Sequence, residues 1–321
     1  MPGVGRKLAI AGASLVAVAI VLAALVRIPS TRFAILRTVL PLTATLTVAP
    51  LRGDAYWISG GISNTGFIVG DTGVVVIDTQ MFVSTARKQL EVIGRITPRP
   101  VNAVILTHSD PDHINGLPAY PRGIEIIAQD NAKADIVRAV RDPASNGFPA
   151  EPGLEAYMPT QTVRDTATQV IDGVTLRLIH TAPAHTDGDL AVYLPAQKIV
   201  FAGDLLTPGI GPWPGIHLDK HGSSLGWIES VKAILALDAD LYVPGHGDIL
   251  PKAELARRLA ASVARRAQIK ALFDAGKTLD EAKAALADVP LKGTAAQFPT
   301  FVATTCQELA AEKGAARAPS N

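Results

Sequence analysis

Short apolar runs alternate with amphipathic segments along most of the chain after residue 45. The unbroken β-branched run Val74–Ile77 predicts a fully buried strand, and helical spacing follows it over 84–96. Glycine-punctuated runs at 56–61 and 66–70 predict a hairpin. Further strands are expected over 103–106, 124–128, 175–179, 190–194, 199–202 and 241–243, and helices over 132–140, 253–273, 279–286 and 302–313. The mixture predicts an α+β fold in which two β-sheets pack together with helices outside, rather than a parallel doubly wound sheet.

Two segments do not fit this alternation. Residues 141–165 are rich in Pro, Gly and Asn without a clear period, which is typical of a substrate lid and equally of a solvated linker. Residues 8–26 form an uncharged apolar run of 19 residues preceded by Arg6 and Lys7. A helix of that length spans a bilayer core of roughly 30 Å, whereas secretory signal cores run to about 15 residues.

We therefore expect a single N-terminal transmembrane or signal-anchor helix that attaches the protein to the membrane. Arg6 and Lys7 on one side are balanced by Arg27, Arg32 and Arg37 on the other, so the positive-inside rule gives little orientation. We expect an extracytoplasmic catalytic domain, which would be secreted if the segment were cleaved.

Composition excludes several classes of partner and site. The 30 basic and 29 acidic residues leave a net charge of +1, so no overall field recruits nucleic acid. The single cysteine excludes an intrachain disulfide and any multi-thiolate metal site. A metal ion would therefore bind to nitrogen and oxygen ligands. The oligomeric state is not specified by the sequence.

Metal-type ligands stand at the ends of several predicted strands, where side chains converge at a sheet edge. The first cluster is the run 107–113, Thr-His-Ser-Asp-Pro-Asp-His, directly after the strand at 103–106. Three glycine-flanked positions follow at later strand ends. The candidate ligands are His108, Asp110, Asp112, His113, His185, Asp204 and His246. A lone histidine in such a place is usually structural, but their recurrence predicts a metal centre.

The order of these residues resembles the metallo-β-lactamase superfamily, which has an αββα sandwich, an H-x-H-x-D-H loop and later His, Asp and His ligands. The resemblance covers roughly residues 45–250, which leaves 1–44 as anchor and connector and 251–321 as a C-terminal helical extension. It implies that His108, Asp110 and His185 hold one metal ion, that Asp112, His113 and His246 hold a second, and that Asp204 bridges them. Asp78 would brace the ligand loop, as a residue outside the metal's own ligands often does.

Asp110 stands where the family usually has histidine. A carboxylate can bind zinc but also suits iron or manganese, so two divalent ions are expected, most simply Zn²⁺, with Fe or Mn open. Diiron flavoproteins of the same superfamily have a glutamate at this position.

With an aspartate rather than a cysteine at position 204, the chain resembles the glyoxalase II and lactonase branches. These imply hydrolysis of a small-molecule ester, thioester, lactone or related amide by a metal-activated hydroxide, with Asp112 as the catalytic carboxylate that orients it or moves its proton. Alternatives are a non-hydrolytic iron-dependent redox enzyme of the same fold and a membrane-tethered non-catalytic scaffold. Nuclease chemistry lacks the expected basic stripe.

Other polar residues receive simpler interpretations. His217 and His221 follow Asp204 in the chain and are interpreted mainly as surface histidines, with substrate contact as the alternative. Asn64 lies in a Ser-Asn-Thr-Gly turn, a setting that favours asparagine regardless of function, with a position that faces the site as the alternative.

Overall fold

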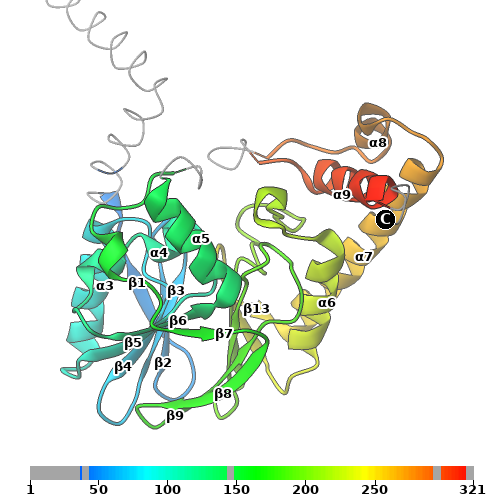
Figure 1. Ribbon diagram of the computed structural model, residues 1–321. Helices are drawn as coiled ribbons and strands as arrows, with labels where there is room; N and C mark the ends of the chain where they lie inside the picture. The colour runs from blue at the N-terminus through cyan, green and yellow to red at the C-terminus, as the bar shows by residue number, and fades with distance from the viewer. Residues whose placement is uncertain (1–36, 38–42, 143–147, 292–297, 316–321) are drawn as a thin grey trace, which may run out of the picture. The chain divides into compact units, whose positions relative to one another are not determined.

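The computed structural model describes residues 37, 43–142, 148–291 and 298–315. From residue 46 onward the chain forms one compact unit built on two β-sheets (Figure 1). The predicted division of the chain at residues 45 and 251 stays a prediction.

Seven strands of the described residues form the first sheet, in the order in which they occur in the chain. They are β1 (Thr47–Pro50), β2 (Ala55–Ser59), β3 (Thr65–Val69), β4 (Val74–Ile77), β5 (Val101–Ile105), β6 (Glu125–Gln129) and β7 (Gln161–Val163). Strands β1 to β4 pair antiparallel, and β4 to β7 pair parallel. The parallel half aligns the carboxyl ends of β4 and β5 at one edge, which is where the ligand loop begins.

Six strands of the described chain form the second sheet, in the order β13-β12-β11-β10-β9-β8. They are β8 (Thr166–Ile171), β9 (Val174–Ile179), β10 (Ala191–Leu194), β11 (Ile199–Gly203), β12 (Leu241–Pro244) and β13 (Leu250–Pro251). Strands β11 and β12 are parallel, so their carboxyl ends also share one edge.

Helices cover the outer face of each sheet, as Figure 1 shows. The first sheet packs against α3 (Val83–Ile96) and α5 (Asp130–Arg141), with α4 (Pro111–Ile114), η1 (Leu117–Ala119) and η3 (Leu154–Ala156) beside them. The second sheet packs against α6 (Ser224–Leu235) and α7 (Lys252–Asp274), and η4 (Leu218–Lys220) precedes α6. Helices α8 (Leu279–Ala285) and α9 (Phe301–Ala315) pack in turn on α7, and α9 also contacts α6.

Strand β4 shows why its sequence is uniformly apolar. Val74 and Val76 pack into the core under α3 and α5, whereas Val75 and Ile77 pack into the core between the two sheets. A strand between two cores is apolar at every position, because alternate side chains face opposite sides. The predicted sandwich of two sheets with helices outside is confirmed.

The irregular segment predicted over 141–165 contains more structure than its composition indicated. Strand β7 and η3 both fall inside it, and β7 adds parallel to β6. Residues 143–147 lie outside the described residues. The prediction of a wholly irregular insertion was therefore wrong for its second half.

Within the described residues, the structure has no helix that is both long and apolar enough to span a bilayer. The predicted anchor at 8–26 lies outside the described residues, so a transmembrane helix has no structural support there.

Candidate metal centre

The predicted ligands converge from loops at the carboxyl ends of three strands and from one further loop. His108 and Asp110 follow β5, and α4 carries Asp112 and His113. Asp204 follows β11, His246 follows β12, and His185 lies in the loop between β9 and β10. Parallel pairing of β4 with β5 and of β11 with β12 brings these ends to the same rim. The structure thus places together all seven side chains selected from the sequence.

The seven side chains fall into two groups whose donor atoms lie within 4.8 Å of one another. We call them the first group, His108, Asp110, His185 and Asp204, and the second group, Asp112, His113 and His246. Asp204 lies between the groups, since its Oδ2 is 3.7 Å from His185 Nε2 and its Oδ1 is 3.3 Å from His113 Nε2. The arrangement could bind a pair of metal ions with Asp204 shared between them.

All four histidines use Nδ1 for a hydrogen bond outside the cluster and turn Nε2 toward it. The Nδ1 partners are Thr107 Oγ1 for His108 at 3.0 Å, Asp78 Oδ2 for His113 at 2.8 Å, the Gly215 carbonyl for His185 at 2.9 Å, and the Ile62 carbonyl for His246 at 3.0 Å. A carbonyl or carboxylate acceptor requires a proton on Nδ1, which leaves a lone pair on Nε2 of the neutral ring. That is the tautomer a metal ligand needs.

Asp78 fixes two of these rings at once. Its Oδ1 accepts from the Thr107 backbone N–H at 2.8 Å, and its Oδ2 accepts from the Thr107 hydroxyl at 2.8 Å and faces His113 Nδ1. Because the Thr107 hydroxyl gives its proton to Asp78, its oxygen accepts from His108 Nδ1. Asp78 is 2% exposed with φ of 60°, a backbone conformation that aspartate tolerates better than most residues. The carboxylate therefore braces the ligand loop, as the family resemblance implied.

Buried polar atoms without partners mark the centre of the cluster. Among the described residues, His108 Nε2, His113 Nε2 and Asp204 Oδ1 are fully buried and make no hydrogen bond. An unsatisfied buried nitrogen costs free energy unless a ligand satisfies it. Imidazole and carboxylate donors with no thiolate suit zinc, iron or manganese, so the residues present fit a pair of such ions.

The electrostatics of the cluster show that protons occupy it when no cation is bound. Burial alone would lower the pKa of His246, but Asp204 and Asp112 raise it to about 10. Burial would also lower the pKa of His185, yet Asp110 and Asp204 raise it to about 9. Burial would raise the pKa of Asp204, but the charges of His246 and His113 hold it well below its usual value. A metal ion that binds at neutral pH must therefore displace protons.

Glycine and asparagine position the last ligands. A Cβ at Gly245 would overlap with Asp204 Oδ1, so only glycine lets this backbone pass the carboxylate. Asn64 Nδ2 donates to the carbonyls of Pro244 and Gly247 at 3.0 and 2.7 Å, which holds the loop that carries His246. The sequence left open that Asn64 faces the site, and the turn motif did not indicate that its side chain holds this loop.

Asp110 has two partners that the sequence did not indicate. Lys220 Nζ lies 2.5 Å from Asp110 Oδ1, and His217 Nε2 lies 3.7 Å from Asp110 Oδ2. Burial alone would raise the pKa of Asp110, but Lys220, His217 and His108 together hold it well below its usual value. The interpretation of His217 as a surface residue was wrong, since its side chain is 15% exposed and its ring contacts that of His185. His221 is exposed, as expected.

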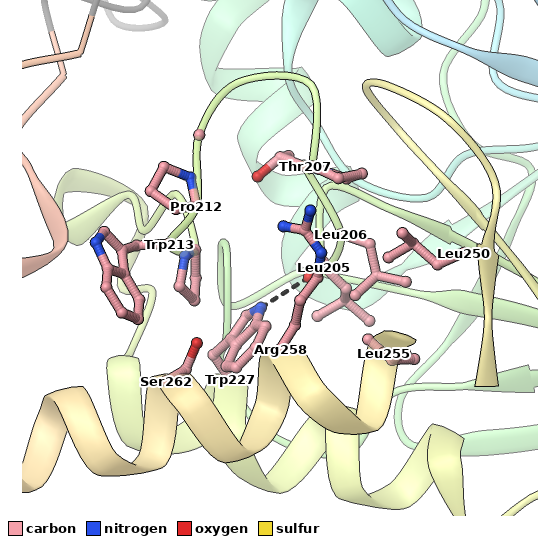
Figure 2. Close-up of a pocket in the computed structure, with 13 residues that line it drawn as sticks. Leu205, Leu206, Thr207, Pro212, Trp213, Trp227, Leu250, Leu255, Arg258 and Ser262 are labelled. Carbon is pink, nitrogen blue, oxygen red and sulfur yellow. Dashed lines mark hydrogen bonds between the residues drawn. The ribbon is translucent and has the colours of Figure 1, made fainter. Parts of the chain in front are cut away.

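A shallow hollow that is partly open to solvent lies beneath the loop that follows Asp204 (Figure 2). Trp213, Trp227, Leu206 and Leu250 line it, with Arg258 projecting from α7. The Trp227 indole donates to the Leu205 carbonyl at 2.7 Å, which fixes that ring in the core. The same loop contacts the metal cluster through the Gly215 carbonyl, which accepts from His185 Nδ1.

Two relatives of known activity share sequence with this chain. The chain is 33% identical over 206 residues to the 2,4-dinitroanisole O-demethylase subunit alpha of Nocardioides sp. (strain JS1661), a match that covers 63% of this chain and 57% of that protein. It is 26% identical over 212 residues to the linear primary-alkylsulfatase of Pseudomonas sp. (strain ATCC 19151), covering 54% of this chain and 39% of the sulfatase. The matches thus span less than two thirds of either relative.

Solved structures share the fold. The stereoselective inverting sec-alkylsulfatase from Pseudomonas sp. superposes with a TM-score of 0.63 at 19% identity, over 86% of this chain and 52% of that one. A metallo-beta-lactamase from Pontibacter korlensis gives 0.56 at 21% identity, over 68% and 99%. The sequence pattern of the metallo-beta-lactamase superfamily matches residues 58–246, which contain every candidate ligand. This chain belongs to the metallo-beta-lactamase superfamily.

Proposed function

We propose that this protein is a metal-dependent hydrolase that cleaves an ester, thioester, lactone or related amide of a small molecule, with Zn²⁺ in both groups. One observation carries the proposal: four imidazoles, each oriented through Nδ1 and three of them buried, direct Nε2 at three carboxylates within two adjoining groups. Such a bound pair of cations lowers the pKa of a water molecule and polarises the scissile bond.

The protein's own residues would divide the remaining work. Asp112 and His246 form the more open side of the cluster, with side chains 17% and 15% exposed, against 5% for Asp204. Burial would raise the pKa of Asp112, but His113 and His246 lower it, so the carboxylate is ionised at neutral pH. An ionised carboxylate at the open side accepts a hydrogen bond from an attacking water and can carry its proton to the leaving group.

The apolar surroundings indicate what the substrate carries besides the scissile bond. Phe298 is 38% exposed, and its ring lies 4.8 Å from that of His217 beside the first group. This surface suits a substrate with an aliphatic or aromatic portion. The names of the relatives add two further candidate bonds, a sulfate ester and an aryl methyl ether, which belong in the same test.

The test is a metal analysis joined to a substrate panel. Protein purified without added metal is expected to hold two equivalents of zinc and to hydrolyse at least one of a p-nitrophenyl ester, a thioester, a lactone, an alkyl sulfate or a methoxyarene. Chelation should abolish the activity, and zinc should restore it, because the cations activate the water.

Two competing functions give different results in that test. Redox-active iron with no hydrolysis would favour the iron-dependent oxidation that Asp110 motivates. A protein with no stoichiometric metal and no activity would be the non-catalytic scaffold. Either result would overturn the hydrolase proposal.

We further propose that residues 8–26 anchor the protein in a membrane, on the strength of their length and lack of charge. The full chain is then expected to sediment with membranes and to be released by detergent but not by high salt. Removal of residues 1–44 should leave a soluble protein with unchanged metal content. Recovery of the full chain in the soluble fraction would contradict the anchor.

A further inference from the structure

Asp110, which replaces the family's usual histidine, is held by a buried lysine. Lys220 Nζ donates to Asp110 Oδ1 at 2.5 Å and to Ser109 Oγ at 3.4 Å, and its side chain is 4% exposed. The other oxygen, Asp110 Oδ2, lies 3.2 Å from His185 Nε2 and 3.6 Å from His108 Nε2. The two oxygens of one carboxylate therefore have separate partners, one lysine and one ligand cluster.

Backbone hydrogen bonds fix Lys220 in this place. It ends η4, its N–H donates to the His217 carbonyl at 3.1 Å, and its carbonyl accepts from Asp187 N–H at 2.9 Å. The same loop is joined to the loop that carries His185, because His217 N–H donates to the His185 carbonyl at 2.8 Å. The ammonium group is thus positioned by the segment that also positions His185.

The charges of Lys220 and Asp110 compensate each other in the buried site. An ammonium buried without a counterion is strongly destabilising, and among the ion pairs of the described residues Asp110 is the carboxylate within 4.0 Å of Lys220. The Asp110 carboxylate and the Lys220 ammonium sum to zero, which is the charge of the neutral imidazole that the family has at position 110. The first group with Lys220 therefore carries the same net charge as a group with a third histidine.

We propose that Lys220 is a positioning residue of the first metal site, and that Asp110 and Lys220 act as one unit in place of the missing histidine. Lys220 binds Oδ1, neutralises the added charge, and leaves Oδ2 directed at the cation. The inference rests on the proposed function only in requiring that the first group bind a metal ion.

A double-mutant cycle tests this unit by zinc content and zinc affinity, without any assay of hydrolysis. The proteins are the wild type, Lys220→Met, Asp110→His and the double variant Asp110→His/Lys220→Met. Lys220→Met should lower affinity for one zinc ion by about 10–100-fold, as for other residues that orient a ligand. Asp110→His should also weaken that site, because Lys220 then remains as an unpaired cation beside it.

The double variant should regain two zinc ions with affinity within about tenfold of wild type, since a neutral imidazole needs no ammonium. A merely structural lysine would instead make Lys220→Met equally harmful in the wild-type and Asp110→His backgrounds, which would overturn the proposal. Equal or greater zinc affinity in Lys220→Met would also overturn it. Lys232→Met, which removes an exposed lysine paired with Glu229, is the control and should change nothing.

The cycle remains decisive if Lys220→Met does not fold, because Asp110→His and the double variant can then be compared directly. Failure of the double variant to bind zinc better than Asp110→His would reject the unit. A wild-type protein that holds two zinc ions but hydrolyses nothing would reject the proposed function alone. A wild-type protein that holds no metal would reject both.

Discussion

The Asp204→Ala variant is expected to lose both metal ions and to hydrolyse its substrate more than about 100-fold slower, since even a residue outside the ligand set costs about 10–100-fold. The reason is its position between the groups. Its Oδ2 lies 3.3 Å from His246 Nε2 and 3.7 Å from His185 Nε2, and its Oδ1 lies 3.3 Å from His113 Nε2. Both metal sites would then lose the carboxylate that they share. Zinc content after dialysis and the rate of hydrolysis measure the effect.

A matched control is available near the same rim. Asp248 is an exposed carboxylate two residues after His246, so Asp248→Ala should keep two zinc ions and wild-type activity. Single replacement of His246, in contrast, should remove mainly the ion of the second group. Retention of two tightly bound zinc ions by Asp204→Ala would exclude its role as the shared ligand.

Much of the fold could be predicted because the pattern of apolar residues in many strands reflects how those strands are buried. Strand β4 lies between two cores, so every position is apolar and the strand is evident from its sequence. Strand β8 was missed because its side chains alternate between exposed and half-buried, and Thr166–Ile171 carries a mixed polar pattern. Strand β7 was missed because three residues are too short for any period to show. Strand β7 also depends on a partner that is distant in the sequence, because it pairs with β6.

The ligands could be predicted for a related reason, since each follows a strand whose end is visible in the sequence. Except for Asp78, the residues that orient them could not. Lys220 lies 110 positions after Asp110, in a polar loop where lysine is ordinarily exposed, and only the fold shows that its ammonium is buried. His217 was misread because its loop turns back onto His185, a path that no periodicity encodes. Asp78 was found through the family's pattern.

The Asp78→Asn variant is expected to bind zinc about 10–100-fold more weakly than wild type while it keeps its fold. Asparagine tolerates the φ of 60° at this position and has the same shape, so the backbone need not change. Its oxygen can still accept from the Thr107 N–H, but its amide group donates where Oδ2 accepted. His113 Nδ1 then faces a donor instead of an acceptor, which favours the tautomer with the proton on Nε2, the atom that should bind the cation.

Zinc titration and thermal unfolding, each measured on the same samples, separate the two consequences of Asp78→Asn. We expect the free energy of unfolding of the metal-free protein to fall by about 1–3 kcal/mol, the cost of unsatisfied buried donors. Asp172→Asn is the matched control, because Asp172 also has a positive φ, of 49°, and accepts from Thr72 and Asn102. It contacts none of the ligands, so the control should lose some stability and no zinc affinity. Equal zinc affinity in Asp78→Asn and wild type would show that the tautomer of His113 is set without this carboxylate.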